Sequence, residues 1–332
     1  MAKNCRSGDR AASERSRLRP IRCRCVTLFR ADRCNEMTRQ SSSRLRQKRD
    51  NLLLLPPFLS RRRPSVSSHQ LTLRWRGRSL SPMTLKTKRY NSAPITEAVI
   101  EIRLQPSTTV APAVLQQLAE SLKADFPKQA PMQFLEMGVA QQPGQALQQS
   151  FSQSIVGVRL SKTDDSRILQ IRHEGFAYSH MAPYTDWATF RAEAQPLWKR
   201  YREVFPEKKL TRCALRYINR IDIPEAKIEL YDYFELYPKV PEALPQQDVI
   251  AMALNLQMPQ TDLHCVANLA QALGEPVKAG HISFILDIDI FRLQIEDWND
   301  EATWAFLEKL RDRKNEIFEA CITNRTRKLI AR

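Results

Sequence analysis

The net positive charge of this chain comes entirely from its first 82 residues, because the basic and acidic side chains of the other residues balance. This distribution separates a basic segment from a neutral remainder that can fold. The segment contains 19 Arg and 2 Lys against 5 Asp and Glu, whereas the remaining 250 residues contain 31 basic and 31 acidic side chains. It has no apolar periodicity long enough to bury one face, so we expect a disordered basic extension. The net charge of +16 therefore describes the extension and does not mark the rest of the chain as a nucleic-acid binder.

Three interpretations of residues 1–82 stay open. Much Arg, Ser and Pro with little Lys is typical of a translated non-coding frame, in which case we expect the native chain to start at Met83. An Arg- and Ser-rich, acid-poor segment also matches an organelle transit peptide, and a basic arm can neutralise phosphates. Nucleic acid is thus an expected partner only if the extension is genuine. No membrane association is expected, because the one apolar run, at residues 52–59, is too short to span a bilayer.

The remainder of the chain alternates between two kinds of apolar pattern. Strict alternation of apolar and polar residues predicts half-buried strands, at residues 98–104, 156–160, 168–181, 213–223, 249–258, 263–273 and 281–293. Apolar residues spaced by three and four predict amphipathic helices, at residues 110–126, 187–205 and 304–321. We expect Thr185 or Asp186 to cap the second helix and Asp300 to cap the third, and a Gln-rich loop at residues 141–153.

This order predicts an α+β fold in which mainly antiparallel sheets have long amphipathic helices on one face. Each half of the sequence ends in a long helix, which is compatible with two similar lobes. We place the first α+β lobe at residues 89–223 and the second at 249–330. A Pro- and Tyr-rich connection at residues 224–248 separates them.

Three segments of this chain resemble one known family. They are the Ala-Pro-Ile-Thr-Glu-Ala opening at residues 93–98, the Arg-Tyr-Ile-Asn-Arg-Ile centre at 216–221, and the closing segment at 307–323. Together they resemble a sporadically distributed family of uncharacterised prokaryotic proteins, over about residues 83–332. The resemblance implies a soluble bacterial accessory protein and an extraneous first segment. It implies no activity, because that family has no established catalytic or binding residues.

Two charged strands provide the candidate catalytic residues. Alternation places Arg216 and Arg220 on one face of one strand, and Asp287 and Asp289 on one face of another. If the strands are neighbours, these groups can form a polar cleft, in which guanidinium groups hold a carboxylate or phosphate and a carboxylate acts as a base. That arrangement would suit a hydrolase or nuclease. The interpretation we favour is an ion-paired outer face of the sheet, which needs no ligand.

The candidate ligand-binding residues come from the segment around the most aromatic helix. They are Tyr178, His180, Trp187, Trp198 and Asn219. These side chains could line a cavity between the sheet and its helices, although aromatic residues at helical spacing are more often part of a core.

The sequence predicts neither a cofactor nor a metal. Phosphate-cradling glycine loops, a Gly-x-Ser-x-Gly elbow and zinc-ligand spacings do not occur after residue 83. Cys213, Cys265 and Cys321 lie in apolar stretches and are expected to be buried thiols of a reducing cytoplasm. We therefore expect a cytoplasmic, non-enzymatic module that binds an unknown protein partner or small ligand.

Overall fold

A computed structural model describes residues 90–105, 112–140, 148–206, 209–293, 295 and 299–331. The predicted extension at residues 1–82 and the predicted start at Met83 lie outside the described residues. The described chain falls into two compact units, one containing residues 133–154 and the other the rest. We describe each unit by itself.

Within the described residues, nine strands form one sheet in the order β2-β3-β4-β5-β1-β6-β9-β8-β7. The register of the pairs from β3 to β7 in this order is antiparallel throughout. Residues 133–140 and 148–154, in the smaller unit, belong to β2 and β3. The bounds are β1 Ile95–Leu104, β2 Lys128–Ala140, β3 Gln148–Ser161, β4 Arg167–Arg172, β5 Gly175–Met181, β6 Leu210–Ile223, β7 Ala253–Gln260, β8 Cys265–Gly274 and β9 Ile282–Leu293.

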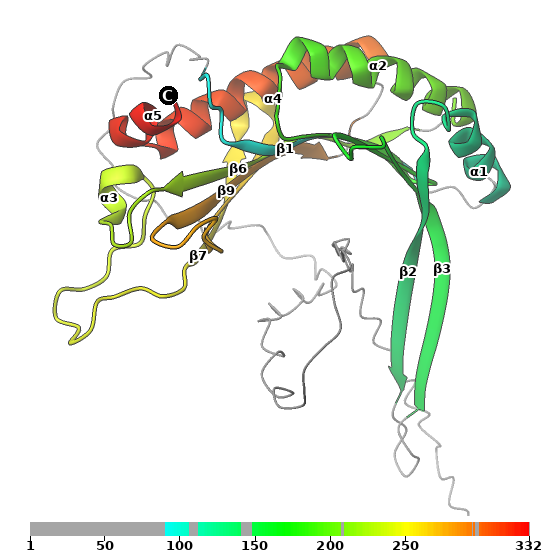
Figure 1. Cartoon of the computed structure of the whole chain (residues 1–332). Coiled ribbons are helices and arrows are strands. Elements are labelled where there is room, and N and C mark those ends of the chain that lie inside the picture. The colour runs from blue at the N-terminus through cyan, green and yellow to red at the C-terminus, as the bar shows by residue number, and fades with distance from the viewer. Residues whose placement is uncertain are drawn as a thin grey trace, which may run out of the picture. The chain divides into compact units, whose positions relative to one another are not determined.

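The long helices α2 and α4 lie on one face of the larger unit's sheet (Figure 1). Helix α2 packs on β5, and α4 packs on β6 and β9. The short helices α3 and α5 pack against each other. The bounds are α1 Pro112–Ser121, α2 Trp187–Val204, α3 Leu230–Tyr233, α4 Asp300–Cys321 and α5 Asn324–Ile330, with a single 3-10 turn at Thr261–Leu263.

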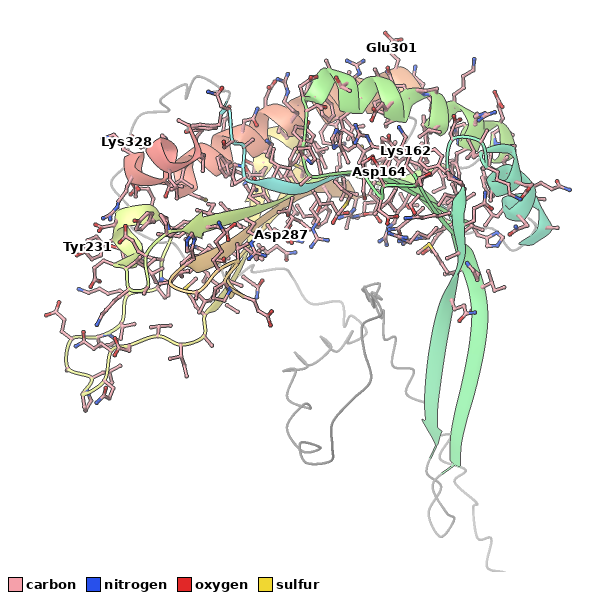
Figure 2. The ribbon with its side chains drawn as sticks, viewed as in Figure 1. Lys162, Asp164, Tyr231, Asp287, Glu301 and Lys328 are labelled. Atoms are coloured by element: carbon pink, nitrogen blue, oxygen red, sulfur yellow. The ribbon has the colours of Figure 1, made fainter. Side chains whose placement is uncertain are left out.

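The alternation seen in the sequence explains which face of the sheet the helices cover. On β6 and β9 the apolar positions are buried under the helices, and the charged positions face the other way, as Asp287 shows in Figure 2. Leu215, Leu286, Ile288 and Ile290 are all fully buried in this core. The predicted α+β fold of antiparallel strands with helices on one face is confirmed.

The two predicted lobes are joined through the centre of the sheet. Strand β6, from the first predicted lobe, pairs along twelve residue positions with β9, from the second. The connection at residues 224–248 links the halves along the chain and contains α3. The two predicted lobes therefore share one sheet, and the division of the chain into two similar lobes stays a prediction.

Several observed elements differ in detail from the predicted ones, among them the Gln-rich loop predicted at residues 141–153, of which residues 148–153 belong to β3. The strand predicted at residues 168–181 is two strands, β4 and β5, because the chain turns at His173 and Glu174. Strand β2 was not predicted, since Pro131 and Gly138 interrupt its apolar pattern. The residue that caps α4 is Asn299, whose side chain accepts from the Ala302 N–H, and not Asp300.

Candidate functional site

The four candidate catalytic residues lie on the face of the sheet that α2 and α4 do not cover, and each is engaged in an ion pair. Arg216 Nε donates to Asp287 Oδ1 at 2.9 Å, so the predicted cross-strand pair forms. Asp289 accepts at 2.9 Å from Arg212, which also pairs with Glu101. These pairs match the ion-paired outer face that the sequence favoured.

Arg220 has neighbours other than the predicted aspartates. Its Nε donates to Asp222 Oδ1 at 2.9 Å, and its Nη2 donates to Ser283 Oγ at 3.2 Å. It does not meet Asp287 or Asp289 in an ion pair among the described residues. Burial raises the pKa of Asp289, and the neighbouring Arg212 opposes that effect. The four residues are thus brought to one face without converging on a shared point.

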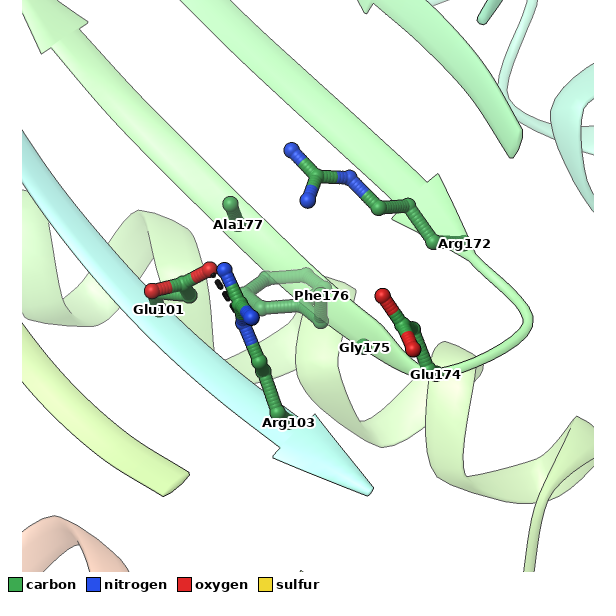
Figure 3. A pocket seen from close by; sticks show the side chains of 7 residues that line it. All are labelled: Glu101, Arg103, Arg172, Glu174, Gly175, Phe176 and Ala177. Atoms are coloured by element: carbon green, nitrogen blue, oxygen red, sulfur yellow. Dashed lines mark hydrogen bonds and ion pairs between the residues drawn. The ribbon is translucent and has the colours of Figure 1, made fainter. Parts of the chain in front are cut away.

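A shallow depression on the same face lies beside the Arg172–Glu174 turn (Figure 3). It is bordered by Glu101 and Arg103, which form an ion pair of 2.7 Å, and by Arg172 and Glu174. The depression encloses no space that a small molecule could fill. We therefore look for a ligand site on the other face of the sheet.

Three of the five candidate ligand residues belong to the core. Tyr178 is 1% exposed and donates to Glu193 at 3.0 Å. Trp198 is also buried and donates through Nε1 to Asp300 at 3.0 Å. His180 is fully buried between the Met181 carbonyl and the Thr185 hydroxyl, and burial lowers its pKa. These side chains have their polar atoms satisfied within the protein and do not line the cavity described next.

The other two candidates, Trp187 and Asn219, line an open cavity of about 870 Å³ between the sheet and its helices. Its walls come from four parts of the chain: the segment before β1, the loop before α2, the middle of β6, and the second half of α4. The residues are 90–95, 182–187, Tyr217, Asn219, Arg311, Lys314, Asn315, Phe318 and Glu319. A volume of this size suits a small-molecule ligand.

The loop and strand that form this cavity are fixed by hydrogen bonds. Asp186 caps α2 by accepting from the Thr189 N–H at 2.9 Å. The Tyr184 and Tyr217 hydroxyls lie 3.0 Å apart. Asn219 Nδ2 donates to the Leu286 carbonyl at 3.0 Å, which holds its side chain under the cavity. These contacts make the cavity a preformed feature of the fold.

Lys314 is the most unusual side chain of the cavity. Its residue is 8% exposed, and its Nζ lies 4.0 Å from the centroid of the Tyr217 ring. Among the residues that the structure describes, no hydrogen bond or ion pair involves this ammonium group. Burial, reinforced by the positive charge of Arg311, lowers its pKa from 10.5 to about 7, while Glu319 acts in the opposite direction. A buried amine of this kind is a recognised mark of a functional site.

The carboxylates beside Lys314 are already engaged. Glu319 accepts from the Tyr90 hydroxyl at 2.6 Å through one oxygen and from Arg327 Nε at 2.8 Å through the other. Asp186 accepts at the N-terminus of α2 from both the N–H and the hydroxyl of Thr189. The positive charge of Lys314 is therefore not neutralised by a direct ion pair with either carboxylate.

Two further buried donors stand in the cavity wall. Trp187 Nε1 is buried and has no acceptor among the described residues. Arg311 Nε lies 3.1 Å from Asp312, close enough for an ion pair, but it is not aligned for a hydrogen bond. Arg311 Nη2 also donates to Glu308 Oε2 at 3.2 Å, so Trp187 Nε1 is the unused donor of these two residues.

The spacing of apolar residues in the sequence contains a signal for Lys314. Leu310, Lys314 and Phe318 are spaced by four, so the lysine occupies the apolar face of the last long helix. Tyr184 and Arg311 gave no comparable signal, because an aromatic loop residue and a polar helix residue are common.

The described chain offers little support for metal or thiol chemistry. No group of three or more His, Cys, Asp or Glu residues is placed to hold a metal ion in the part of the chain that is described. Cys213, Cys265 and Cys321 are buried, as predicted, and burial raises their thiol pKa values to about 12, 11 and 12. A neutral buried thiol is a poor nucleophile.

Two comparisons with known proteins found no relative of this chain. No family model matches the chain. No match to a curated protein was found either. The resemblance to the sporadic prokaryotic family stays a prediction, and the functional argument rests on the cavity. None of the helices in the described ranges is long and apolar enough to cross a membrane.

Proposed function

We propose that this protein is a binding module whose cavity takes a small acidic molecule, with a carboxylate or phosphate group placed against Lys314. The observation behind this proposal is a buried amine that faces an 870 Å³ cavity and has no acceptor within the described chain. The proposal makes the predicted ligand-binding module more specific, because it names one binding site, the cavity, and one class of ligand, small acids.

The energetic argument concerns the cost of keeping a lysine there. Moving an ammonium group from water into a protein interior without an acceptor costs several kcal/mol. An anionic ligand would offset that cost, because a charge-assisted hydrogen bond in a partly buried site is among the stronger polar contacts. The positive charge of Arg311 adds to the attraction at the same wall of the cavity.

Several features favour binding by the cavity over chemistry on the charged sheet face. There, Arg216 pairs with Asp287, Arg212 with Asp289, and Arg220 with Asp222. A hydrolase or nuclease would need these groups for its substrate.

The buried thiols of Cys213, Cys265 and Cys321 support a protein of a reducing compartment, and we propose a cytoplasmic one.

The test is a thermal-shift screen of small carboxylates and sugar phosphates at pH 7. The matched control is Lys309→Met, since Lys309 is exposed on the same helix. We expect at least one ligand to raise the melting temperature of the wild type and of Lys309→Met but not of Lys314→Met. Absence of any stabilising acid, or equal stabilisation of Lys314→Met, would contradict the proposal.

A further inference from the structure

We infer that Lys314 is a nucleophile, and that the ligand of this cavity has an aldehyde or ketone carbon with which Lys314 Nζ forms a reversible imine. The ligand class is therefore an oxo acid or an aldehyde acid. This inference rests on the proposed acidic-ligand site and names the second functional group of its ligand.

The position of Nζ is the first argument. It lies over the face of the Tyr217 ring, 4.0 Å from the centroid, and both residues line the cavity. A ring face attracts an ammonium group but does not accept its hydrogens in the way that a carboxylate does. The nitrogen is thus held in place at the cavity wall, and no ion pair within the described chain restrains it.

The protonation state of Lys314 is the second argument. The titratable and charged groups around it are Arg311 and Glu319 on its own helix, Tyr217 on β6, Tyr184 and Asp186 in the loop before α2, and Tyr90 before β1.

Glu319 and Asp186 are engaged elsewhere, and burial raises the pKa of each of the three tyrosines, so these hydroxyls stay neutral. Burial and Arg311 hold the pKa of Lys314 near 7. At neutral pH a large share of this lysine is the free amine, about 1,000-fold more than for an ordinary lysine.

The step itself balances with no oxidant or reductant. The lone pair of the neutral Nζ attacks the carbonyl carbon, and a proton moves from nitrogen to oxygen to give a carbinolamine. Loss of the hydroxyl group and of the second N–H hydrogen as water then leaves the C=N bond, and water reverses the reaction. Amines activated by desolvation react with carbonyl compounds in this way.

An acid group on the same molecule is carried over from the proposed acidic-ligand site. Arg311 borders the space beside Lys314, and the neighbouring carboxylates already have their own partners. Once the imine has formed, Lys314 is no longer available as a simple anchor for the anion, so Arg311, which also pairs with Glu308 and Asp312, is the remaining cation among the described lining residues.

Trapping the imine by reduction tests this inference. The full chain is incubated at pH 7 with glyoxylate, a small aldehyde acid, and with cyanoborohydride, and the modified lysines are located by peptide mass spectrometry. We expect Lys314 to gain the mass of the probe less one oxygen atom, at least about tenfold faster than the exposed Lys309, because its excess of free amine outweighs the lower nucleophilicity of a weaker base. Labelling of Lys314 no faster than Lys309 would overturn the inference.

A second variant separates this inference from the proposed function. Lys314→Arg keeps a positive charge in the cavity but cannot form the imine, and it also shows whether the fold tolerates a change here. We expect Lys314→Arg to give no trapped adduct at position 314, while Lys309 is labelled as in the wild type. Stabilisation of the wild type by acids without any trapping at Lys314 would refute the imine and leave the binding function standing; the absence of both would refute the two together.

Discussion

Lys314 is the side chain on which the functional account depends at the scale of single residues. Its pKa is lower in the folded chain than in the unfolded one, so the unfolded state binds more protons between about pH 7 and pH 10.5. Above about pH 10.5, Lys314 therefore does not lower the free energy of unfolding. As the pH falls towards 7, it lowers the free energy of unfolding by an increasing amount. The expected loss at pH 7 is on the order of 4 kcal/mol for an unliganded cavity.

Replacing Lys314 by Met should consequently stabilise the empty protein. We expect the free energy of unfolding at pH 7 to rise by about 2–4 kcal/mol, with the gain shrinking as the pH approaches 10. Urea denaturation at several pH values measures this, with Lys309→Met as the control that should change by less than about 0.5 kcal/mol. A variant less stable than the wild type at pH 7 would show that Lys314 has a structural partner.

Gln271 provides a second prediction at this scale. Its side chain is 1% exposed, and neither its amide nitrogen nor its amide oxygen has a hydrogen-bond partner among the described residues. An unsatisfied buried amide costs about 1–3 kcal/mol, so Gln271→Met should raise the denaturation midpoint. The matched change Asn219→Leu should lower it, since the Asn219 amide donates to the Leu286 carbonyl. A lower midpoint for Gln271→Met would indicate an internal water or another partner.

At the scale of elements, the pairing of β3 with β4 depends on Gly157, because a residue with a Cβ atom would not fit there. A Cβ atom added to Gly157 would lie 2.3 Å from the Ile171 carbonyl oxygen, whereas one added to Gly274 would meet nothing closer than 3.4 Å. We expect Gly157→Ala to destabilise the protein by more than about 2 kcal/mol, because backbone must move, and Gly274→Ala to change it little. Chemical denaturation of the pair decides this, and equal stabilities would contradict the close approach of the two strands.

Strands in which apolar and polar residues alternate could be predicted from the sequence. Strands without this alternation could not. Strands β1, β6 and β9 are half-buried, so their apolar positions alternate. Strand β5 has six buried residues in succession, which hides its boundary with β4. For the site, Trp187 and Asn219 were predicted, but the cavity also needs Lys314 and Arg311, which come close to them only through the packing of α4 on β6.

At the scale of the whole molecule, the larger unit has one continuous sheet and one core, from which we expect cooperative unfolding. The β6–β9 pairing joins residues from both predicted lobes, and the core beneath α2 and α4 is one cluster. A fragment of residues 224–332 should therefore be unfolded, since β9 would keep β8 but lose β6, and α4 would lose the same strand. Circular dichroism of that fragment measures this, and a cooperative thermal transition of the isolated fragment would show that the second lobe is independent.

The measurement that tests the central claim most directly is the titration of the Lys314 amine, followed by NMR of the protein with isotope-labelled lysine side chains and assigned with Lys314→Arg. The account predicts a midpoint near pH 7 for the free protein. It predicts a higher midpoint when the cavity holds an acidic ligand that has no aldehyde or ketone group. A midpoint close to the ordinary 10.5 would mean that Lys314 is hydrated or paired, and would contradict the assignment of this cavity as an acidic-ligand site.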